Sequence, residues 1–307
     1  MSPRYRAQVL AWVRAGGVFA WAGLRGGGEE GERWHLAGSG EHKQNTFDDF
    51  AAAADHLLAA DWSEPGRIAV MGTSNGGLLV GAALTQQPGK YAAVVCRAPL
   101  LDMVRYERSG LGPSWVPEYG SAHDPGQLRT LLGYSPYHRV TPGTAYPAVL
   151  LAASDGDTRT DPLHARKMCA ALQHATTGPA PVLLRLEHGV SHGARSVSRA
   201  IALEAECLAF LAHQVGQPAP QPPGRNHTVR PLAPPLPKTQ ATDRNHCFGR
   251  WVAAVFAAAV VVAVMGYRGC CTLKRQALLP GRPPDRWGPA RTPTRPRAPP
   301  RQGGRVV

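Results

Sequence analysis

The chain alternates short apolar runs with segments whose apolar residues recur at helical spacing. The apolar runs lie at 68–71, 91–96, 147–153 and 182–186, and they predict buried strands. The segments with helical spacing lie at 45–60, 78–84, 162–174 and 198–215. Strands that alternate with helices in this way are typical of an α/β fold with a doubly wound, mainly parallel sheet.

Two segments precede the first of these helices. Positions 5–14 have helical spacing, and positions 16–24 form an apolar run that we expect to be a strand. Together they also imitate a signal peptide, but Arg14 interrupts the apolar region. The stretch 26–31 formally matches the dinucleotide-binding pattern G-x-G-x-x-G. Because no apolar helix opens at its last glycine, it predicts a turn instead.

A serine flanked by glycines stands between the run at 68–71 and the helix that follows. Gly72-Thr73-Ser74-Asn75-Gly76 fits the pattern G-x-S-x-G, in which small residues allow a sharp turn that lifts the serine hydroxyl above the sheet edge. The pattern is common in glycine-rich chains, so the strand before it and the helix after it matter. With both in place, the sequence predicts a nucleophile elbow at Ser74, and an ordinary glycine-rich turn is the alternative.

Two later strand ends carry an aspartate and a histidine. Asp157 follows the run at 147–153, and His192 follows the run at 182–186. Because the carboxyl ends of parallel strands meet at one edge of a sheet, we expect Ser74, Asp157 and His192 to converge there. Their order along the chain is the one that α/β-hydrolases use. The alternatives are a turn role for Asp157 and a surface position for His192.

With these residues in place, residues 5–213 resemble the catalytic domain of the prolyl oligopeptidase family of serine peptidases. The stretches that carry the resemblance are LRGGGEEGERWH (24–35), KQNTFDDF (43–50), GTSNGGLLV (72–80), WVPEYGS (115–121), YSPYHRV (134–140), DTRTDPLHARKM (157–168) and SHGA (191–194). The resemblance implies an α/β-hydrolase fold and cleavage of proline-containing peptides through an acyl-enzyme. It implies no metal and no organic cofactor.

The resemblance also implies a role for each candidate residue. Ser74 is the nucleophile, His192 the general base and Asp157 the carboxylate that orients it, and the N–H of Asn75 is one oxyanion donor. The side chains implied to bind substrate are Trp115 on the proline, Tyr119 beside it and Arg159 on a peptide carbonyl. A flat indole suits a pyrrolidine ring, and a guanidinium offers several donors in a fixed fork. Core packing is the alternative for the two aromatic residues.

Family members also carry a β-propeller and an early loop with a tyrosine that is a second oxyanion donor. The sequence begins downstream of both, so we expect an exposed sheet edge and weaker turnover. Loss of one oxyanion donor costs on the order of a hundredfold to a thousandfold. Two alternatives to a prolyl peptidase therefore stay open. One is an esterase or aminoacyl-peptidase without proline preference, and the other is an inactive, membrane-anchored remnant.

Composition changes sharply near position 216. Of the 307 residues, positions 217–307 hold 15 of the 34 Lys/Arg, 16 of the 29 prolines and two of the 21 acidic residues. The net charge of +13 therefore belongs to this part of the chain. We expect a peptidase domain (1–216), a Pro-rich linker (217–250), a possible transmembrane helix (251–267) and a basic, disordered tail (268–307).

The possible transmembrane helix is a run of 17 residues without a charge, WVAAVFAAAVVVAVMGY. As a helix it reaches about 25 Å, which is short for a bilayer, and aromatic residues stand at both ends. We therefore expect either a single-pass membrane protein, on a side left open, or a cytoplasmic one. An unintended reading frame is the alternative for 217–307. The basic end is expected to be a solvated tail, and nucleic acid is not an expected partner.

The six cysteines form no C-x-x-C pair and no spaced His/Cys set, so neither a zinc site nor a disulfide scaffold is expected. Three of them, Cys96, Cys169 and Cys207, fall in apolar segments and are expected to be core thiols.

Overall fold

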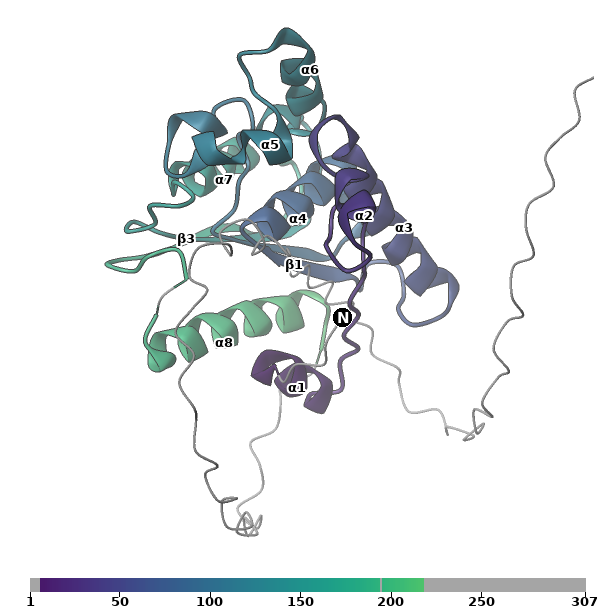
Figure 1. Cartoon of the computed structure of the whole chain (residues 1–307). Helices are drawn as coiled ribbons and strands as arrows, with labels where there is room; N and C mark the ends of the chain where they lie inside the picture. The colour runs from purple at the N-terminus through teal and green to yellow at the C-terminus, as the bar shows by residue number, and fades with distance from the viewer. Residues whose placement is uncertain (1–5, 194, 218–307) are drawn as a thin grey trace, which may run out of the picture. The chain divides into compact units, whose positions relative to one another are not determined.

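Residues 6–193 and 195–217 are described by the computed structural model (Figure 1). Apart from Gln217, the predicted linker, membrane span and tail (217–250, 251–267 and 268–307) lie outside these residues. In the described part of the chain, no helix is both long enough and apolar enough to cross a membrane.

The described sheet has four strands, all parallel, in the order β1-β2-β3-β4. They are β1 (Ala69–Thr73), β2 (Ala93–Arg97), β3 (Ala148–Ser154) and β4 (Val182–Glu187). Each strand lies where an apolar run predicts one. The runs are nearly continuous because helices cover both faces of the sheet, and every residue of β3 is buried.

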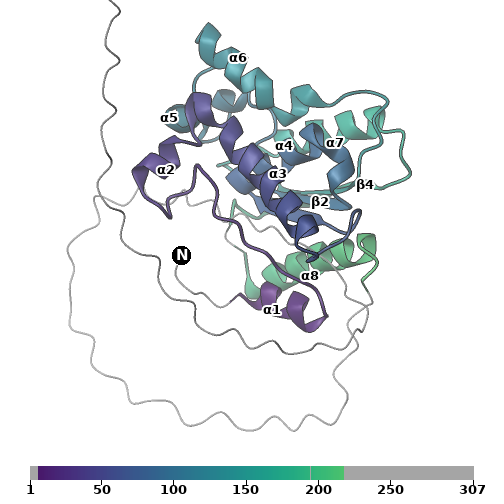
Figure 2. The same ribbon diagram turned by 90° about the vertical axis from the view of Figure 1, so that its right-hand side faces the viewer.

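Helices lie on both sides of the sheet (Figures 1 and 2). On one side lie α3 (Gln44–Ala59), α4 (Asn75–Gln86) and α7 (Leu163–Ala175), and on the other lie α1 (Ala7–Arg14) and α8 (Val197–Gln214). Successive residues of a strand feed the two sides in turn. Val70 belongs to the core cluster with Phe47 and Leu78, whereas Ala69 belongs to the cluster with Trp12 and Leu203. The doubly wound, parallel arrangement predicted from the sequence is therefore confirmed for the described residues.

The strand predicted at 16–24 is wrong, because only a single bridge residue, Ala20, occurs there. The side chains alternate between the two sides of the sheet, as in a strand. Phe19 and Trp21 pack against the core cluster of Trp12 and Leu203, whereas Leu24 lies in the core cluster of Phe47 and Leu78, and Ala20 and Ala22 pack against that cluster. The apolar side chains of this segment are therefore accommodated by packing, and no named strand of the described sheet includes them. The exposed edge of the sheet that we expected from the sequence is only partly present. β1 ends the described sheet, but Ala69 and Val70 are fully buried.

Several short helices fall in segments for which no element was predicted. The α-helices are α2 (Glu32–Leu36), α5 (Val116–Tyr119) and α6 (Pro125–Tyr134). The 3-10 helices are η1 (Gly40–His42), η2 (Pro88–Lys90), η3 (Tyr106–Arg108), η4 (Gly112–Trp115) and η5 (Pro136–Arg139). The three cysteines expected in the core are free and buried, which confirms that prediction.

Candidate active site

Ser74 occupies the turn between β1 and α4. Its backbone has φ 60° and ψ −117°, a strained conformation for a residue with a side chain. The turn is held by two hydrogen bonds, from Ser74 N–H to Arg97 O (2.8 Å) and from Leu78 N–H to Ser74 O (3.1 Å). A Cβ on Gly72 would lie 1.9 Å from Gly76 O, so only glycine fits there. The strand, tight turn and helix predicted around the serine are all present.

Asn75 is the first residue of α4. Its N–H therefore has no acceptor within the helix, and no described residue accepts from it. A helix N-terminus with a free N–H favours a negative charge nearby. The side chain of Asn75 is held by Tyr119, whose hydroxyl donates to Asn75 Oδ1 at 3.0 Å. The structure thus joins two of the predicted site residues.

Asp157 and His192 form a hydrogen-bonded pair on the loops after β3 and β4. His192 Nδ1 lies 2.7 Å from Asp157 Oδ2, and the two side chains are 17% and 1% exposed. The N–H groups of Arg159 and Thr160 both donate to Asp157 Oδ1 at 2.9 Å. Burial raises the pKa of Asp157, but the hydrogen bond from His192 and those from the backbone outweigh it, so the pKa is lowered. The carboxylate is therefore ionised at neutral pH and can orient the imidazole.

A second Asp–His pair lies on the same two loops. His188 Nδ1 lies 2.6 Å from Asp155 Oδ2, and these side chains are 78% and 37% exposed. The two pairs differ in burial. Only Asp157 is shielded from water, and a shielded carboxylate interacts more strongly with an imidazole than one facing solvent does.

Ser74, Asp157 and His192 follow three parallel strands and so lie at the same edge of the sheet. Within the described residues, Ser74 Oγ makes no hydrogen bond to His192 or to any other side chain. Such contacts are often long in unliganded sites and tighten when substrate binds. The structure therefore joins the aspartate and the histidine directly and places the serine at their edge of the sheet.

Two predicted substrate residues, Trp115 and Tyr119, lie at the ends of η4 and α5. They are only 5% and 2% exposed and belong to the core cluster. The Tyr119 ring packs edge-on against Tyr106 at a centroid distance of 5.5 Å, and burial raises its pKa well above the usual value. Tyr119 is therefore a neutral hydrogen-bond donor. Both aromatic residues are packed in the core and present little surface to a ligand.

Arg159, in contrast, is exposed, and its guanidinium has no hydrogen-bond or ion-pair partner in the described part of the chain. Its backbone carbonyl accepts from Leu111 N–H at 3.2 Å, and a Cβ on Gly110 would lie 2.4 Å from the same oxygen. The segment that leads into Trp115 therefore runs along the loop that carries Asp157 and Arg159.

Two neighbours of the site were not predicted from the sequence. Thr160 has its hydroxyl oxygen within 3.1 Å of both Asp157 Oδ2 and His192 Nδ1. Glu118, next to Tyr119, pairs at 2.8 Å with Lys43, the residue that follows η1. The signal for Thr160 was its place three residues after Asp157, where a side chain can fold back on a turn. No signal in the sequence predicts the pair of Glu118 and Lys43.

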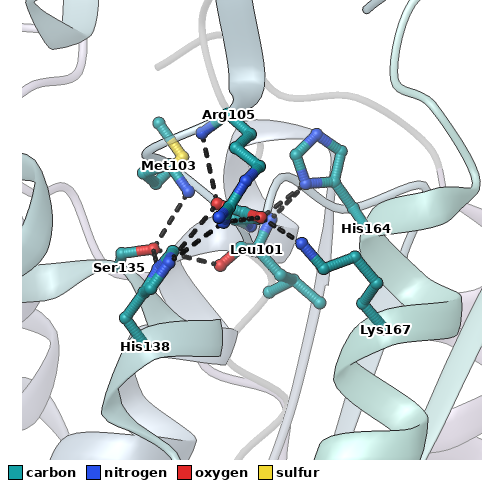
Figure 3. A network of polar contacts seen from close by, with 8 residues as sticks. Leu101, Met103, Arg105, Ser135, His138, His164 and Lys167 are labelled. Carbon is teal, nitrogen blue, oxygen red and sulfur yellow. Dashed lines mark hydrogen bonds and ion pairs between the residues drawn. The ribbon is translucent and has the colours of Figure 1, made fainter. Parts of the chain in front are cut away.

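A polar network ties the loop after β2 to α7 (Figure 3). Asp102 accepts from Lys167 and from Arg105, and His138 lies 3.8 Å from the same carboxylate. His164 Nδ1 accepts the N–H groups of Leu101 and Asp102, at 3.3 and 3.0 Å. Burial lowers the pKa of His164 to about 4, so the ring is neutral and able to accept. The described residues contain no cluster of three or more His, Cys, Asp or Glu that could hold a metal ion.

The model of the prolyl oligopeptidase family matches residues 3–218. A prolyl endopeptidase of Elizabethkingia miricola is 37% identical over 218 residues, which cover 70% of this chain and 31% of the relative. A solved structure from a study of two prolyl endopeptidases has a TM-score of 0.69 at 50% identity and covers 71% of this chain and 32% of that one. A post-proline cleaving enzyme from Rickettsia typhi has a TM-score of 0.64 at 32% identity, covering 69% and 31%.

These likenesses confirm the predicted α/β-hydrolase fold of the described domain. The chain spans just under a third of the length of these relatives.

Proposed function

Because the chain belongs to the prolyl oligopeptidase family, we propose that it is a serine peptidase that cleaves short peptides after proline. The observation that carries the proposal is the buried hydrogen bond between Asp157 and His192, at the sheet edge where the strained turn holds Ser74. A buried carboxylate on Nδ1 leaves Nε2 of His192 as the basic nitrogen. The names of the similar proteins, prolyl endopeptidase and post-proline cleaving enzyme, support the preference for proline.

In the proposed reaction, Ser74 Oγ attacks the carbonyl carbon of the substrate, and His192 Nε2 takes the hydroxyl proton. The N–H of Asn75 stabilises the negative oxygen of the tetrahedral intermediate. When the intermediate collapses, the C–N bond breaks and the leaving amine takes the proton from His192. Water, deprotonated by His192, then hydrolyses the ester on Ser74 and restores the free hydroxyl.

Substrate binding is the second part of the proposal. Arg159 is exposed on the loop that carries Asp157, where its guanidinium can donate to a peptide carbonyl. Trp115 and Tyr119 form the wall for the proline ring, and Tyr119 also steadies Asn75 through its hydroxyl. Because both rings are nearly buried, the proline ring contacts only the margin of this wall.

Labelling with a fluorophosphonate probe tests whether the serine is activated. The wild-type chain is expected to be labelled and Ser74→Ala is not, while Ser114→Ala, which removes an exposed hydroxyl on η4, is labelled like the wild type. A folded wild-type sample that takes no label contradicts the proposal. Labelling that survives in Ser74→Ala assigns the activity to a different serine.

A second candidate is acyl hydrolysis without a preference for proline, as in an esterase or aminoacyl-peptidase. The observation that favours it is the burial of Trp115, which leaves only 5% of the residue exposed to a substrate. Chromogenic prolyl, alanyl and simple ester substrates separate the two candidates. A higher kcat/KM for the prolyl peptide supports the first candidate, and equal values support the second.

A further inference from the structure

Thr160 is placed where three parts of the candidate site meet. Its side chain is buried, with 2% of the residue exposed. The hydroxyl oxygen lies 3.0 Å from Asp157 Oδ2, 3.1 Å from His192 Nδ1 and 3.1 Å from the carbonyl oxygen of Ala98. Neither the acyl-transfer steps above nor the predicted substrate contacts use this residue.

The single hydroxyl proton of Thr160 can serve one acceptor at a time. His192 Nδ1 directs its own proton to Asp157 Oδ2, at 2.7 Å, so it does not compete for the proton of Thr160. The remaining acceptors are the ionised carboxylate of Asp157 and the neutral carbonyl of Ala98. A hydrogen bond to an ionised acceptor is about twice as strong, so the proton belongs on Asp157 Oδ2.

With that bond in place, the Asp157 carboxylate has four donors. Arg159 N–H and Thr160 N–H donate to Oδ1, and His192 Nδ1–H and Thr160 O–H donate to Oδ2. An ionised carboxylate has about four lone-pair sites, so its hydrogen-bonding capacity is filled. Four donors from fixed directions leave the carboxylate only one orientation.

We propose that Thr160 is a positioning residue, whose hydroxyl completes the donors around Asp157 and so fixes the plane in which Asp157 holds His192. The inference rests on the roles proposed above for Asp157 and His192. Thr160 lies next to the sheet, because its Oγ1 is 3.1 Å from the carbonyl oxygen of Ala98, the residue after β2, and Ala98 N–H donates to Ala152 O of β3 at 2.7 Å.

Most of the other charged side chains around the pair have partners elsewhere. On the two loops and at the strand ends, Asp155 pairs with His188, Glu187 with Arg185 and Arg195, and Arg97 with Glu204, while Asp161 accepts from Leu163 N–H and Arg159 is exposed. None of them makes a hydrogen bond to the side chain of Asp157 or His192 among the described residues. A change at Thr160 thus acts on the pair directly.

The test compares Thr160→Val, which keeps the shape and removes the hydroxyl, with Thr160→Ser, which keeps the hydroxyl. Without the fourth donor, the Asp157 carboxylate is no longer held in one orientation, so Thr160→Val is expected to lower kcat about tenfold with KM unchanged. The negative charge of Asp157 is also less compensated and attracts the imidazolium more strongly. The acid limb of the kcat/KM profile is therefore expected to move up by roughly half a pH unit. Thr160→Ser is expected to restore both values. Thr158→Val, an exposed change on the same loop, is the control and leaves both unchanged.

The low-field proton resonance of His192 Nδ1–H provides a second readout that does not depend on turnover. We expect it to shift in Thr160→Val and to return in Thr160→Ser. If the wild type is neither active nor labelled, the proposed function fails, while this resonance still tests the contact of Thr160. A folded Thr160→Val protein with the wild-type resonance and acid limb overturns the inference, as does a Thr160→Ser protein that behaves like Thr160→Val. If Thr160→Val does not fold, Thr160→Ala replaces it in both measurements.

Discussion

Asp157 Oδ2 lies 2.7 Å from His192 Nδ1 in a buried contact, whereas Asp155, two residues earlier, pairs with His188 in solvent. Asp157→Asn replaces the acceptor of Nδ1–H by an amide that can stabilise the wrong tautomer of the imidazole. We expect kcat to fall by a factor on the order of 10⁴, measured with a prolyl chromogenic peptide. Asp155→Asn is the matched control and is expected to keep wild-type turnover. Equal losses in the two variants contradict the assignment of Asp157.

The neutral state of His164 makes stability depend on pH. Its pKa is about 4 in the folded protein because of burial, against about 6.5 in an unfolded chain. The unfolded chain therefore takes up the proton first, so this contribution is complete above about pH 6.5 and is lost as the pH falls towards 4. At roughly 1.4 kcal/mol per unit, the free energy of unfolding falls by about 3 kcal/mol over this window.

Urea denaturation at pH 7.5 and 4.5 measures this loss. His164→Gln keeps an acceptor for the N–H groups of Leu101 and Asp102 but cannot be protonated, so most of the loss is expected to disappear. The control is His123→Gln, at an exposed position, which keeps the wild-type pH dependence. The carboxylates of Asp102 and Asp157, whose pKa values are lowered, lose their contribution only below their usual range near pH 4. A His164→Gln protein with the full wild-type loss contradicts the explanation.

The four strands could be predicted because a strand that is buried on both faces, such as β3, is an unbroken apolar run in the sequence. The run at 16–24 has the same character, yet pairing depends on a neighbouring strand, which local sequence does not record. The short helices α5 and α6 were missed for want of an apolar stripe. A capping signal was nevertheless present for α6, where Asp124 accepts from Gln127 N–H at 2.8 Å and Pro125 follows.

At the site, the strand-to-helix turn of Ser74 was predictable because its glycines have a steric cause. The order of Ser, Asp and His along the chain does not distinguish Asp157 from Asp155, since both follow the same strand. Only the structure shows that the side chain of Asp157 is buried and that of Asp155 is exposed. The spacing of Thr160 from Asp157 allows its side chain to fold back on the turn, but whether the hydroxyl reaches both Asp157 and His192 depends on the conformation of the loop. The catalytic and substrate roles of the site residues stay predictions.

Gly72 is required by the close approach of the backbone beyond the serine. A Cβ there would meet Gly76 O at 1.9 Å and Gly76 C at 2.3 Å, and neither backbone atom can move without opening the turn. Gly72→Ala is expected to lower the free energy of unfolding by about 3 kcal/mol and to abolish fluorophosphonate labelling. Gly133→Ala in α6, where no atom lies within 4 Å, is expected to add about 0.5–1 kcal/mol instead. Similar urea midpoints for the two variants contradict this account.

Lys43 is the buried partner of Glu118, the residue before Tyr119. Its Nζ lies 2.8 Å from Glu118 Oε1, and its side chain is 2% exposed. Lys43→Met leaves Glu118 with His35 as its remaining partner and is expected to cost about 3–5 kcal/mol of unfolding free energy, measured in urea. Adding Glu118→Leu removes the stranded charge and recovers much of that loss. Asp55→Asn breaks the Lys90–Asp55 pair, in which the side chain of Asp55 is 62% exposed, and is expected to cost less than about 1 kcal/mol. A Lys43→Met cost as small as that of Asp55→Asn shows that the buried pair does not hold α5 in place.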